Sequence, residues 1–169
     1  MKTTYLSLGS NVGDREQNIA RGIAALADCG VRVTRQSSLY ATEPREIRTQ
    51  NWFLNCVVEA ETEWMPRQLL HALRELELTL GRRRLVRGGP RVIDFDILLY
   101  GSSIVRLPDL EIPHPRMAER RFVLVPLREL DPALRHPVFK KTVSELLADT
   151  RDMGQVRRWH SRTAAAAAS

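Results

Sequence analysis

Two kinds of hydrophobic periodicity follow each other along the chain, and their order limits the folds that it can adopt. Apolar side chains at every second position predict a strand, whereas a spacing of about 3.6 residues predicts an amphipathic helix. The clearest helix begins at Pro66, ends before Gly81 and carries a leucine stripe at Leu69, Leu73, Leu76 and Leu80. The pattern predicts strand, helix, strand, strand, helix and strand at residues 3–8, 14–29, 31–40, 53–61, 66–80 and 92–100.

This order is typical of the α+β class with a ferredoxin-like split βαβ arrangement, in which helices cover an antiparallel sheet. Residues 42–51 are predicted to form a long loop, and two more helices are predicted near 118–129 and 143–149. We expect one domain over residues 1–160 and an Ala-rich, frayed tail over 161–169. Because this fold hosts many functions, function has to be argued from individual residues.

Composition sets the class of protein and its compartment. The chain has 169 residues, 43% of them hydrophobic, which suits one domain with its own core. Its net charge of +6 favours an anionic partner without choosing between nucleic acid, membrane and a small phosphate compound. Apolar runs are too short to span a membrane, the N-terminus lacks the pattern of a signal peptide, and the two cysteines form no Cys-x-x-Cys. We therefore expect a cytoplasmic protein.

Two carboxylates stand out in the predicted strand over residues 92–100. The period of two places Ile93, Phe95, Ile97 and Leu99 on one side, and Asp94 and Asp96 on the other. At about 6.6 Å between their Cα atoms, the two charges would repel by about 2.5 kcal/mol at an effective dielectric constant of 20. A pair of hard oxygen ligands can hold Mg²⁺ ions that also bind substrate phosphates, although a solvated sheet edge explains Asp-x-Asp alone equally well.

The loop before this strand favours the metal interpretation. Five arginines fall between Gly81 and Pro90 or directly after it, namely Arg82, Arg83, Arg84, Arg87 and Arg91. Guanidinium groups bind phosphate oxygens bidentately and stay charged, so an arginine loop beside paired carboxylates indicates transfer of a phosphate-containing group. A solvated basic loop, or one that binds nucleic acid, is the alternative. His114, between Pro113 and Pro115, is a plausible phosphate contact, although a lone histidine is more often structural.

Three segments together resemble one enzyme family. They are Gly88-Gly89-Pro90-Arg91-Val92-Ile93-Asp94-Phe95-Asp96-Ile97-Leu98-Leu99-Tyr100-Gly101, Ile112-Pro113-His114-Pro115-Arg116-Met117 and Arg120-Arg121-Phe122-Val123-Leu124-Val125-Pro126-Leu127. The sequence resembles 6-hydroxymethyl-7,8-dihydropterin pyrophosphokinase from about Thr3 to Leu147, and Gly9-Ser10-Asn11 and Phe53-Leu54-Asn55 fit the same family. The resemblance implies a ferredoxin-like fold and transfer of a pyrophosphoryl group from ATP to the hydroxymethyl group of a reduced pterin, with release of AMP, in folate biosynthesis.

The resemblance also implies roles for particular residues. Asp94 and Asp96 would ligate two Mg²⁺ ions. Arg82 and Arg91 would stabilise charge at the transferred group, with Arg84 and Arg87 as weaker candidates. Arg120 and His114 would hold ATP phosphates, and Glu77 and Ile97 would line the nucleotide pocket. Phe53 and Phe122 would sandwich the pterin ring, Asn55 would bond its amide edge, and the backbone near Thr42 and Pro44 would close that pocket.

One departure from the family and two other functions stay open at this stage. Family members commonly carry Trp where this chain has Gly88, which keeps open a pterin-binding relative with altered chemistry. An RNA-binding module has the same strand and helix order, but the aromatic run of such modules is not found here. We expect a monomer that binds ATP and a reduced pterin and binds neither nucleic acid nor membrane.

Overall fold

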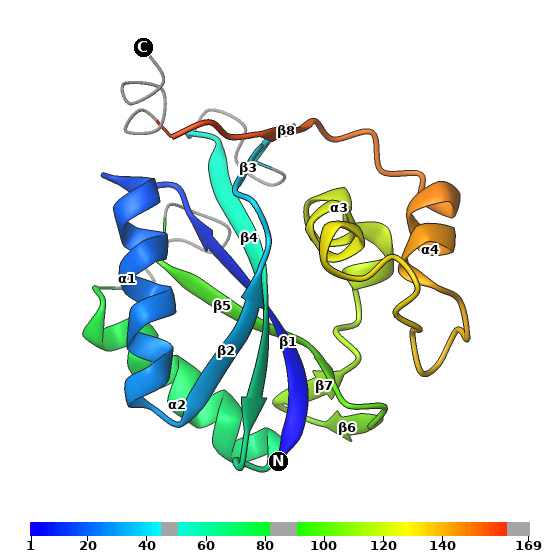
Figure 1. The fold of residues 1–169 in the computed structure, drawn as a ribbon, viewed down its shortest axis with the longest axis horizontal. Helices are drawn as coiled ribbons and strands as arrows, with labels where there is room; N and C mark the ends of the chain where they lie inside the picture. The colour runs from blue at the N-terminus through cyan, green and yellow to red at the C-terminus, as the bar shows by residue number, and fades with distance from the viewer. Residues whose placement is uncertain (45–50, 82–90, 162–169) are drawn as a thin grey trace.

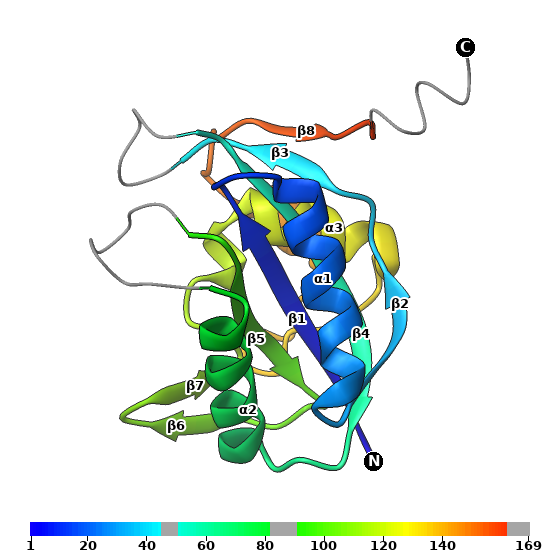
Figure 2. The same cartoon turned by 90° about the vertical axis from the view of Figure 1, so that its left-hand side faces the viewer.

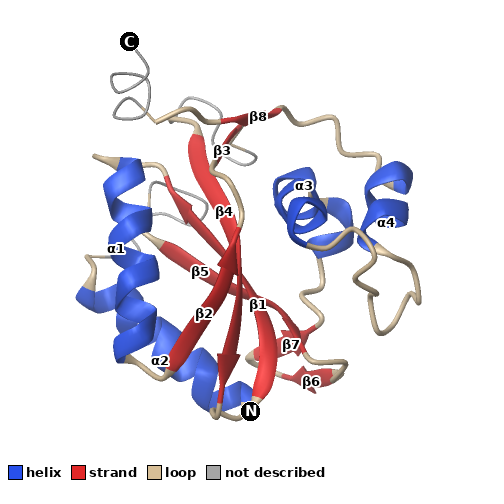
Figure 3. Cartoon of the chain, viewed as in Figure 1, coloured by secondary structure: helices blue, strands red, loops and turns tan. Residues whose placement is uncertain are grey.

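The computed structural model describes residues 1–44, 51–81 and 91–161. Figure 1 shows helices on both sides of a central sheet, and Figure 3 separates the two kinds of element by colour. The strands are β1 (Lys2–Ser10), β2 (Val31–Gln36), β3 (Tyr40–Thr42), β4 (Phe53–Thr62), β5 (Asp94–Tyr100), β6 (Val105–Leu107), β7 (Leu110–Ile112) and β8 (Val156–Arg158). The helices are α1 (Arg15–Asp28), α2 (Pro66–Thr79), α3 (Arg121–Leu130) and α4 (Val143–Asp149), with a 3₁₀ turn at Met117–Glu119.

The main sheet has the strand order β5-β1-β4-β3-β8. β2 lies outside this order and pairs with residues 58–62 of β4, past the stretch of β4 that pairs with β3. All of its pairs are antiparallel, and β1 and β4 lie in the middle. This order of strands, with α1 following β1 and α2 following β4, is the ferredoxin-like arrangement predicted from the sequence.

Each face of the sheet carries its own hydrophobic core. On one face α1 and α2 pack through Ile19, Leu26, Leu69 and Leu73 against buried side chains of β1, β4 and β5. Figure 2 shows both helices lying across that face. On the other face α3 and α4 pack against Tyr5, Val57, Leu98 and Leu99. Both faces of β4 are therefore buried, because Val57, on the face opposite Leu54 and Cys56, is as fully buried as they are.

Local signals placed most of the elements. Asp14 caps α1, since its Oδ1 accepts a hydrogen bond from the Gln17 amide at 3.1 Å. The predicted strand over 31–40 divides into β2 and β3 because Ser37 interrupts it. The Ser37 hydroxyl oxygen accepts a hydrogen bond from the Val57 amide at 3.0 Å, in place of a backbone carbonyl.

Leu99 of β5 does not lie on the sheet face that was predicted for it. The pairing of β1 with β5 shifts between Tyr5 and Leu6, where Leu6 faces Ile97 and Tyr5 faces Leu99. Such a bulge moves every later side chain of the strand to the opposite face. Leu99 consequently packs with α3 and α4, whereas Ile97 packs with α1 and α2. Asp94 and Asp96 precede the shift and keep the common face predicted for them.

The β6–β7 hairpin and β8 were not predicted from the sequence. Each of these strands has only three residues, too few for a period of two to be recognised. The helix predicted near 118–129 is a 3₁₀ turn followed by α3. In the part of the chain that the structure describes, no helix combines the length and apolar character that a membrane crossing requires.

Candidate active site

One end of the sheet face that α3 and α4 cover carries polar residues instead of core residues. Gly9 of β1 pairs with Asn55 of β4 on one side and with Asp94 of β5 on the other. Paired residues of an antiparallel sheet point to the same face, so the two side chains flank a position that has none. Ser7 pairs with Asp96 in the next row. The predicted pterin-binding strand and the predicted metal-binding strand thus present their polar residues on one surface.

The Asp94 and Asp96 side chains are partly open to solvent, with exposed fractions of 19% and 31%. Arg91 lies beside them, since its Nη1 donates to Asp94 Oδ2 at 3.0 Å. Asn11 fixes the backbone of Arg91 in turn, because its Oδ1 accepts from the Arg91 amide at 2.7 Å. Burial, with the neighbouring Asp94 charge, raises the pKa of Asp96 to about 6. The charges of Arg74, Arg120 and Arg91 act against this rise and offset it only in part.

Helix α2 closes the edge of β5 with a charged pair. Glu77 Oε2 accepts a hydrogen bond from the Phe95 amide at 3.2 Å, and Arg74 Nη1 donates to the Phe95 carbonyl at 2.8 Å. The two side chains also bond to each other, and Arg74 Nη2 lies 3.8 Å from Asp96 Oδ1. Burial raises the pKa of Glu77, whose side chain is 1% exposed, to about 7. Arg74 and Glu77 thus hold the backbone of Phe95, the residue between the two aspartates, against α2.

Asp94 and Asp96 fit a magnesium site that substrate oxygens complete. Both offer hard carboxylate oxygens on one face, the ligand type that Mg²⁺ takes together with phosphate oxygens. Among the residues that the structure describes, no group of three or more His, Cys, Asp and Glu side chains is placed to hold a metal ion. A cation at the pair would therefore need oxygen atoms from a bound phosphate compound or from water, as is usual for Mg²⁺.

A groove beside the carboxylate pair contains two of the predicted ATP-binding residues. It has a volume of about 620 Å³, and its lining includes Asp96, Ile97, Arg74 and His114. His114 Nδ1 accepts from the Arg116 amide at 3.1 Å, which places the proton of the neutral ring on Nε2. Burial, with the charges of Arg120 and Arg116, lowers the pKa of His114 to about 4. His114 is therefore a neutral hydrogen-bond donor at physiological pH. Glu77, predicted to line this pocket, instead lies buried under the strand edge.

Arg120 and Phe122 connect the groove with the opposite end of the surface. The Arg120 guanidinium carbon lies 5.4 Å from the centre of the Phe122 ring, within range of a cation–π contact. The charge of Arg120 also acts on both Asp96 and His114. Arg120 is thus placed between the predicted phosphate-binding and pterin-binding residues.

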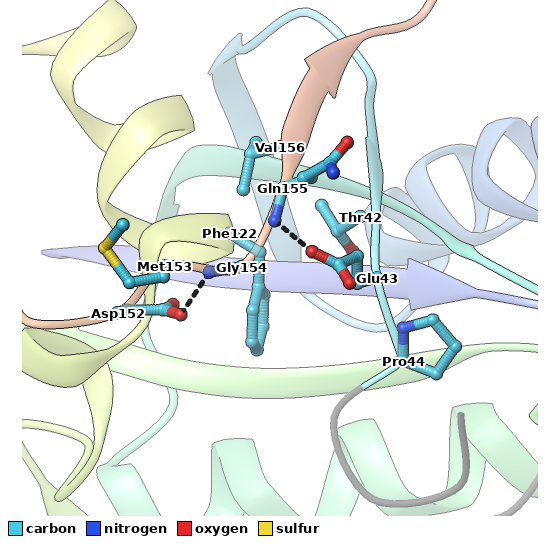
Figure 4. A pocket seen from close by; sticks show the side chains of 9 residues that line it. All are labelled: Thr42, Glu43, Pro44, Phe122, Asp152, Met153, Gly154, Gln155 and Val156. Atoms are coloured by element: carbon cyan, nitrogen blue, oxygen red, sulfur yellow. Dashed lines mark hydrogen bonds between the residues drawn. The ribbon is translucent and has the colours of Figure 1, made fainter.

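The predicted pterin-binding residues meet where β3, β4 and α3 come together. Thr42 pairs with Phe53, and the Thr42 hydroxyl donates to Asn55 Oδ1. Asn55 Nδ2 lies 3.4 Å from the Leu8 carbonyl oxygen, and the side chain is 5% exposed. Thr42, Pro44 and Phe122 line a pocket of about 350 Å³, shown in Figure 4. The structure therefore brings these predicted residues to one end of the sheet, with Asn55 as its buried polar group.

Some predicted residues lie outside the described part of the chain, and other residues of the site were missed. Arg82, Arg84, Arg87 and Gly88 fall outside the described residues. Arg74 was not among the predicted residues, although its position three residues before Glu77 on a helix could have indicated a pair. The segment 152–156, which lines the Phe122 pocket, was also not predicted, because it carries no recognisable periodicity.

Comparison with known proteins identifies the family. The family model described as 7,8-dihydro-6-hydroxymethylpterin-pyrophosphokinase matches residues 5–132. The chain belongs to this family. It is 44% identical over 149 residues to the 2-amino-4-hydroxy-6-hydroxymethyldihydropteridine pyrophosphokinase of Methylorubrum extorquens, covering 88% of this chain and 93% of the relative. It is 39% identical over 160 residues to the Bacillus subtilis protein of the same name, covering 94% and 91%.

Other relatives of this pyrophosphokinase are longer than the chain. It spans 23% of the length of the folic acid synthesis protein FOL1 of Dictyostelium discoideum, at 39% identity over 90% of this chain. Among solved structures it matches wild-type HPPK-DHPS of Plasmodium falciparum with a TM-score of 0.69 and 16% identity, over 87% of this chain and 44% of that one. This structural likeness supports the fold. Family membership makes the chain a transferase that acts in folate synthesis.

Proposed function

We propose that this pyrophosphokinase domain moves the terminal diphosphate of ATP to the hydroxymethyl oxygen of 6-hydroxymethyl-7,8-dihydropterin at the surface between Asn55 and Asp96. The observation that carries the proposal is the shared face of Asn55, Asp94 and Asp96 around Gly9. Strands are about 4.8 Å apart, so β4 and β5 on either side of β1 hold the amide and the carboxylates about 10 Å apart. That span suits a bicyclic ring at one end and its reacting hydroxyl at the other.

Asp94 and Asp96 are the proposed ligands of two Mg²⁺ ions. Held by these two carboxylates, Mg²⁺ would supply positive charge that offsets the charge of the transferred group. Arg91, 3.0 Å from Asp94, would add a fixed positive charge at the same place. Arg82 and Arg84 are proposed to act with it from the segment outside the described residues. Because no protein nucleophile is needed for attack by a hydroxyl on phosphorus, catalysis rests on positioning and preorganised charge.

The remaining residues are proposed to bind the two substrates. His114 would donate a hydrogen bond from its Nε2–H group to a phosphate oxygen of ATP, and Arg120 would supply a positive charge beside it. Ile97 would contact the nucleotide in the groove lined by His114 and Arg74. Glu77 would act on this pocket indirectly, by holding the Phe95 amide.

For the pterin, we propose stacking between Phe53 and Phe122, with Asn55 bonding the amide edge and the backbone of Thr42 and Pro44 closing the pocket. Asn55 supports this role because it is buried on the same surface and its Oδ1 is already oriented by Thr42. A stacked aromatic pair contributes about 0.5–1.5 kcal/mol beyond area burial, so each ring should matter for affinity.

A coupled assay tests the function as a whole. Incubation of the chain with ATP, Mg²⁺ and 6-hydroxymethyl-7,8-dihydropterin should release AMP in equal amounts to pyrophosphorylated pterin. Release of ADP, or binding of the pterin without any turnover, would contradict the proposal and favour a pterin-binding relative with altered chemistry. A monomeric state and a cytoplasmic location remain predictions, which sedimentation and localisation measurements can test.

A further inference from the structure

The C-terminal segment over residues 152–156 forms one wall of the Phe122 pocket. Asp152, Met153, Gly154, Gln155 and Val156 supply five of the nine residues that line it. The other lining residues are Thr42, Glu43, Pro44 and Phe122, three of which are proposed to bind the pterin. Figure 4 shows the Phe122 ring between the turn at Asp152 and Gly154 on one side and Pro44 on the other.

A turn at Asp152 holds the start of α3, where Phe122 is the second residue. Asp152 Oδ2 accepts a hydrogen bond from the Arg121 amide at 2.8 Å, and Arg121 Nη1 donates to the Gly154 carbonyl at 2.9 Å. Asp152 Oδ1 accepts from the Gly154 amide at 2.8 Å, which closes the turn. Arg121, directly before Phe122, is therefore tied to this segment by two bonds, one from its backbone amide to the Asp152 carboxylate and one from its side chain to the Gly154 carbonyl.

The same segment holds the opposite side of the pocket. β8 pairs with β3, with Val156 facing Thr42. The Gln155 amide donates to Glu43 Oε1 at 2.6 Å, and the Glu43 amide donates to the Gln155 carbonyl at 3.3 Å. Hydrogen bonds thus join Asp152 to Arg121, the residue before Phe122, at one end and Gln155 to Glu43 at the other. The distance between the aromatic ring and the Thr42–Pro44 backbone depends on this short stretch.

We propose that Asp152 is a positioning residue for the reduced pterin, acting through Arg121 to fix the Phe122 ring against the Thr42–Pro44 backbone. This inference rests on the proposed function, because it takes Phe122 as one wall of the pterin site. Asp152 lines the Phe122 pocket and does not line the groove beside Asp96, so its effect should fall on the pterin and not on ATP. It also gives Arg121 a structural task, in contrast to the phosphate-binding task proposed for Arg120.

Steady-state kinetics of Asp152→Ala test the inference. We expect the KM for the pterin to rise about tenfold, which corresponds to about 1.4 kcal/mol, while kcat and the KM for ATP stay within about twofold. Asp152→Asn keeps one acceptor oxygen and should give an intermediate KM. Pterin binding measured with a nonhydrolysable ATP analogue present should weaken by the same factors. An unchanged pterin KM, or an equal rise in the KM for ATP, would overturn the inference.

Two controls separate positioning from general damage. Asp149→Ala removes a carboxylate three residues earlier that pairs with Lys141 on the surface, and it should leave both KM values unchanged. In a Phe122→Ala background, Asp152→Ala should add little, because its effect passes through the missing ring. A full additive effect there would contradict the proposed route. If Phe122→Ala alone left pterin affinity unchanged, the pterin site itself would be wrong, which is a separate failure.

Discussion

Asn55 and Asp94 pair with the same glycine from opposite sides. Gly9 lies between them in β1, and a Cβ atom at this position would come within 2.7 Å of Asn55 Nδ2. The missing side chain therefore lets the Asn55 amide lie over β1, toward the strand that carries the aspartates. This relationship explains why a glycine occupies a central, buried strand, where it otherwise weakens the structure.

We predict that Gly9→Ala raises the KM for the pterin by about tenfold, the loss expected when a buried hydrogen-bonding group is displaced. Steady-state kinetics with saturating ATP would measure the change. In an Asn55→Ala background the same substitution should cost much less, because the amide that it displaces is gone. Equal effects in both backgrounds would show that Gly9 serves some purpose other than making room for Asn55.

The carboxylate pair gives a second prediction. Asp94→Asn and Asp96→Asn should each lower kcat by more than about a hundredfold, because a bound metal ion contributes several kcal/mol of charge stabilisation. Circular dichroism should show an unchanged fold, since the asparagine is of equal size. Asp28→Asn, at the exposed end of α1, is the matched control and should retain full activity. Near-normal turnover by either site variant would remove the basis for the metal assignment.

The sequence predicted those parts of the site that a regular strand carries. Asp94 and Asp96 keep a common face because the period of two holds as far as Ile97, and Leu99 was misplaced because a bulge changes the register after it. That Asn55 and Asp94 share one surface depends on strand order, which no local pattern contains. The same holds for Asp152, since its partner Arg121 is 31 residues away and the turn that carries Asp152 has no periodicity.

The neutral state of His114 gives a third prediction. Its ring has a pKa lowered to about 4, so a single N–H, and no charge, is available to a phosphate oxygen. We expect His114→Ala to raise the KM for ATP by about tenfold and His114→Gln, which keeps a neutral donor, to raise it less. The KM for ATP should also show no ionisation of this residue between pH 6 and 8, where a charged histidine would lose its proton. If removing the ring affected only the pterin KM, the ATP-binding role would be wrong.

A last prediction concerns stability away from the site. Arg35 Nη2 lies 2.8 Å from Glu59 Oε2, and with the Tyr5 and Thr34 hydroxyls it lowers the pKa of Glu59 to about 2. A carboxyl whose pKa is lowered by folding stabilises the protein above its ordinary pKa, near 4.5, and loses that contribution as pH falls toward 2. Because Arg35 is 48% exposed, solvent screens the pair, and we expect Glu59→Gln to reduce the free energy of unfolding at pH 7 by about 1 kcal/mol.

Denaturant titrations should show this difference in unfolding free energy shrinking between pH 5 and 3. Glu61→Gln, in the more exposed pair with Arg32, is the control and should change the free energy of unfolding little at pH 7. A difference for Glu59→Gln that stayed constant with pH would mean that the variant acts through packing and not through charge.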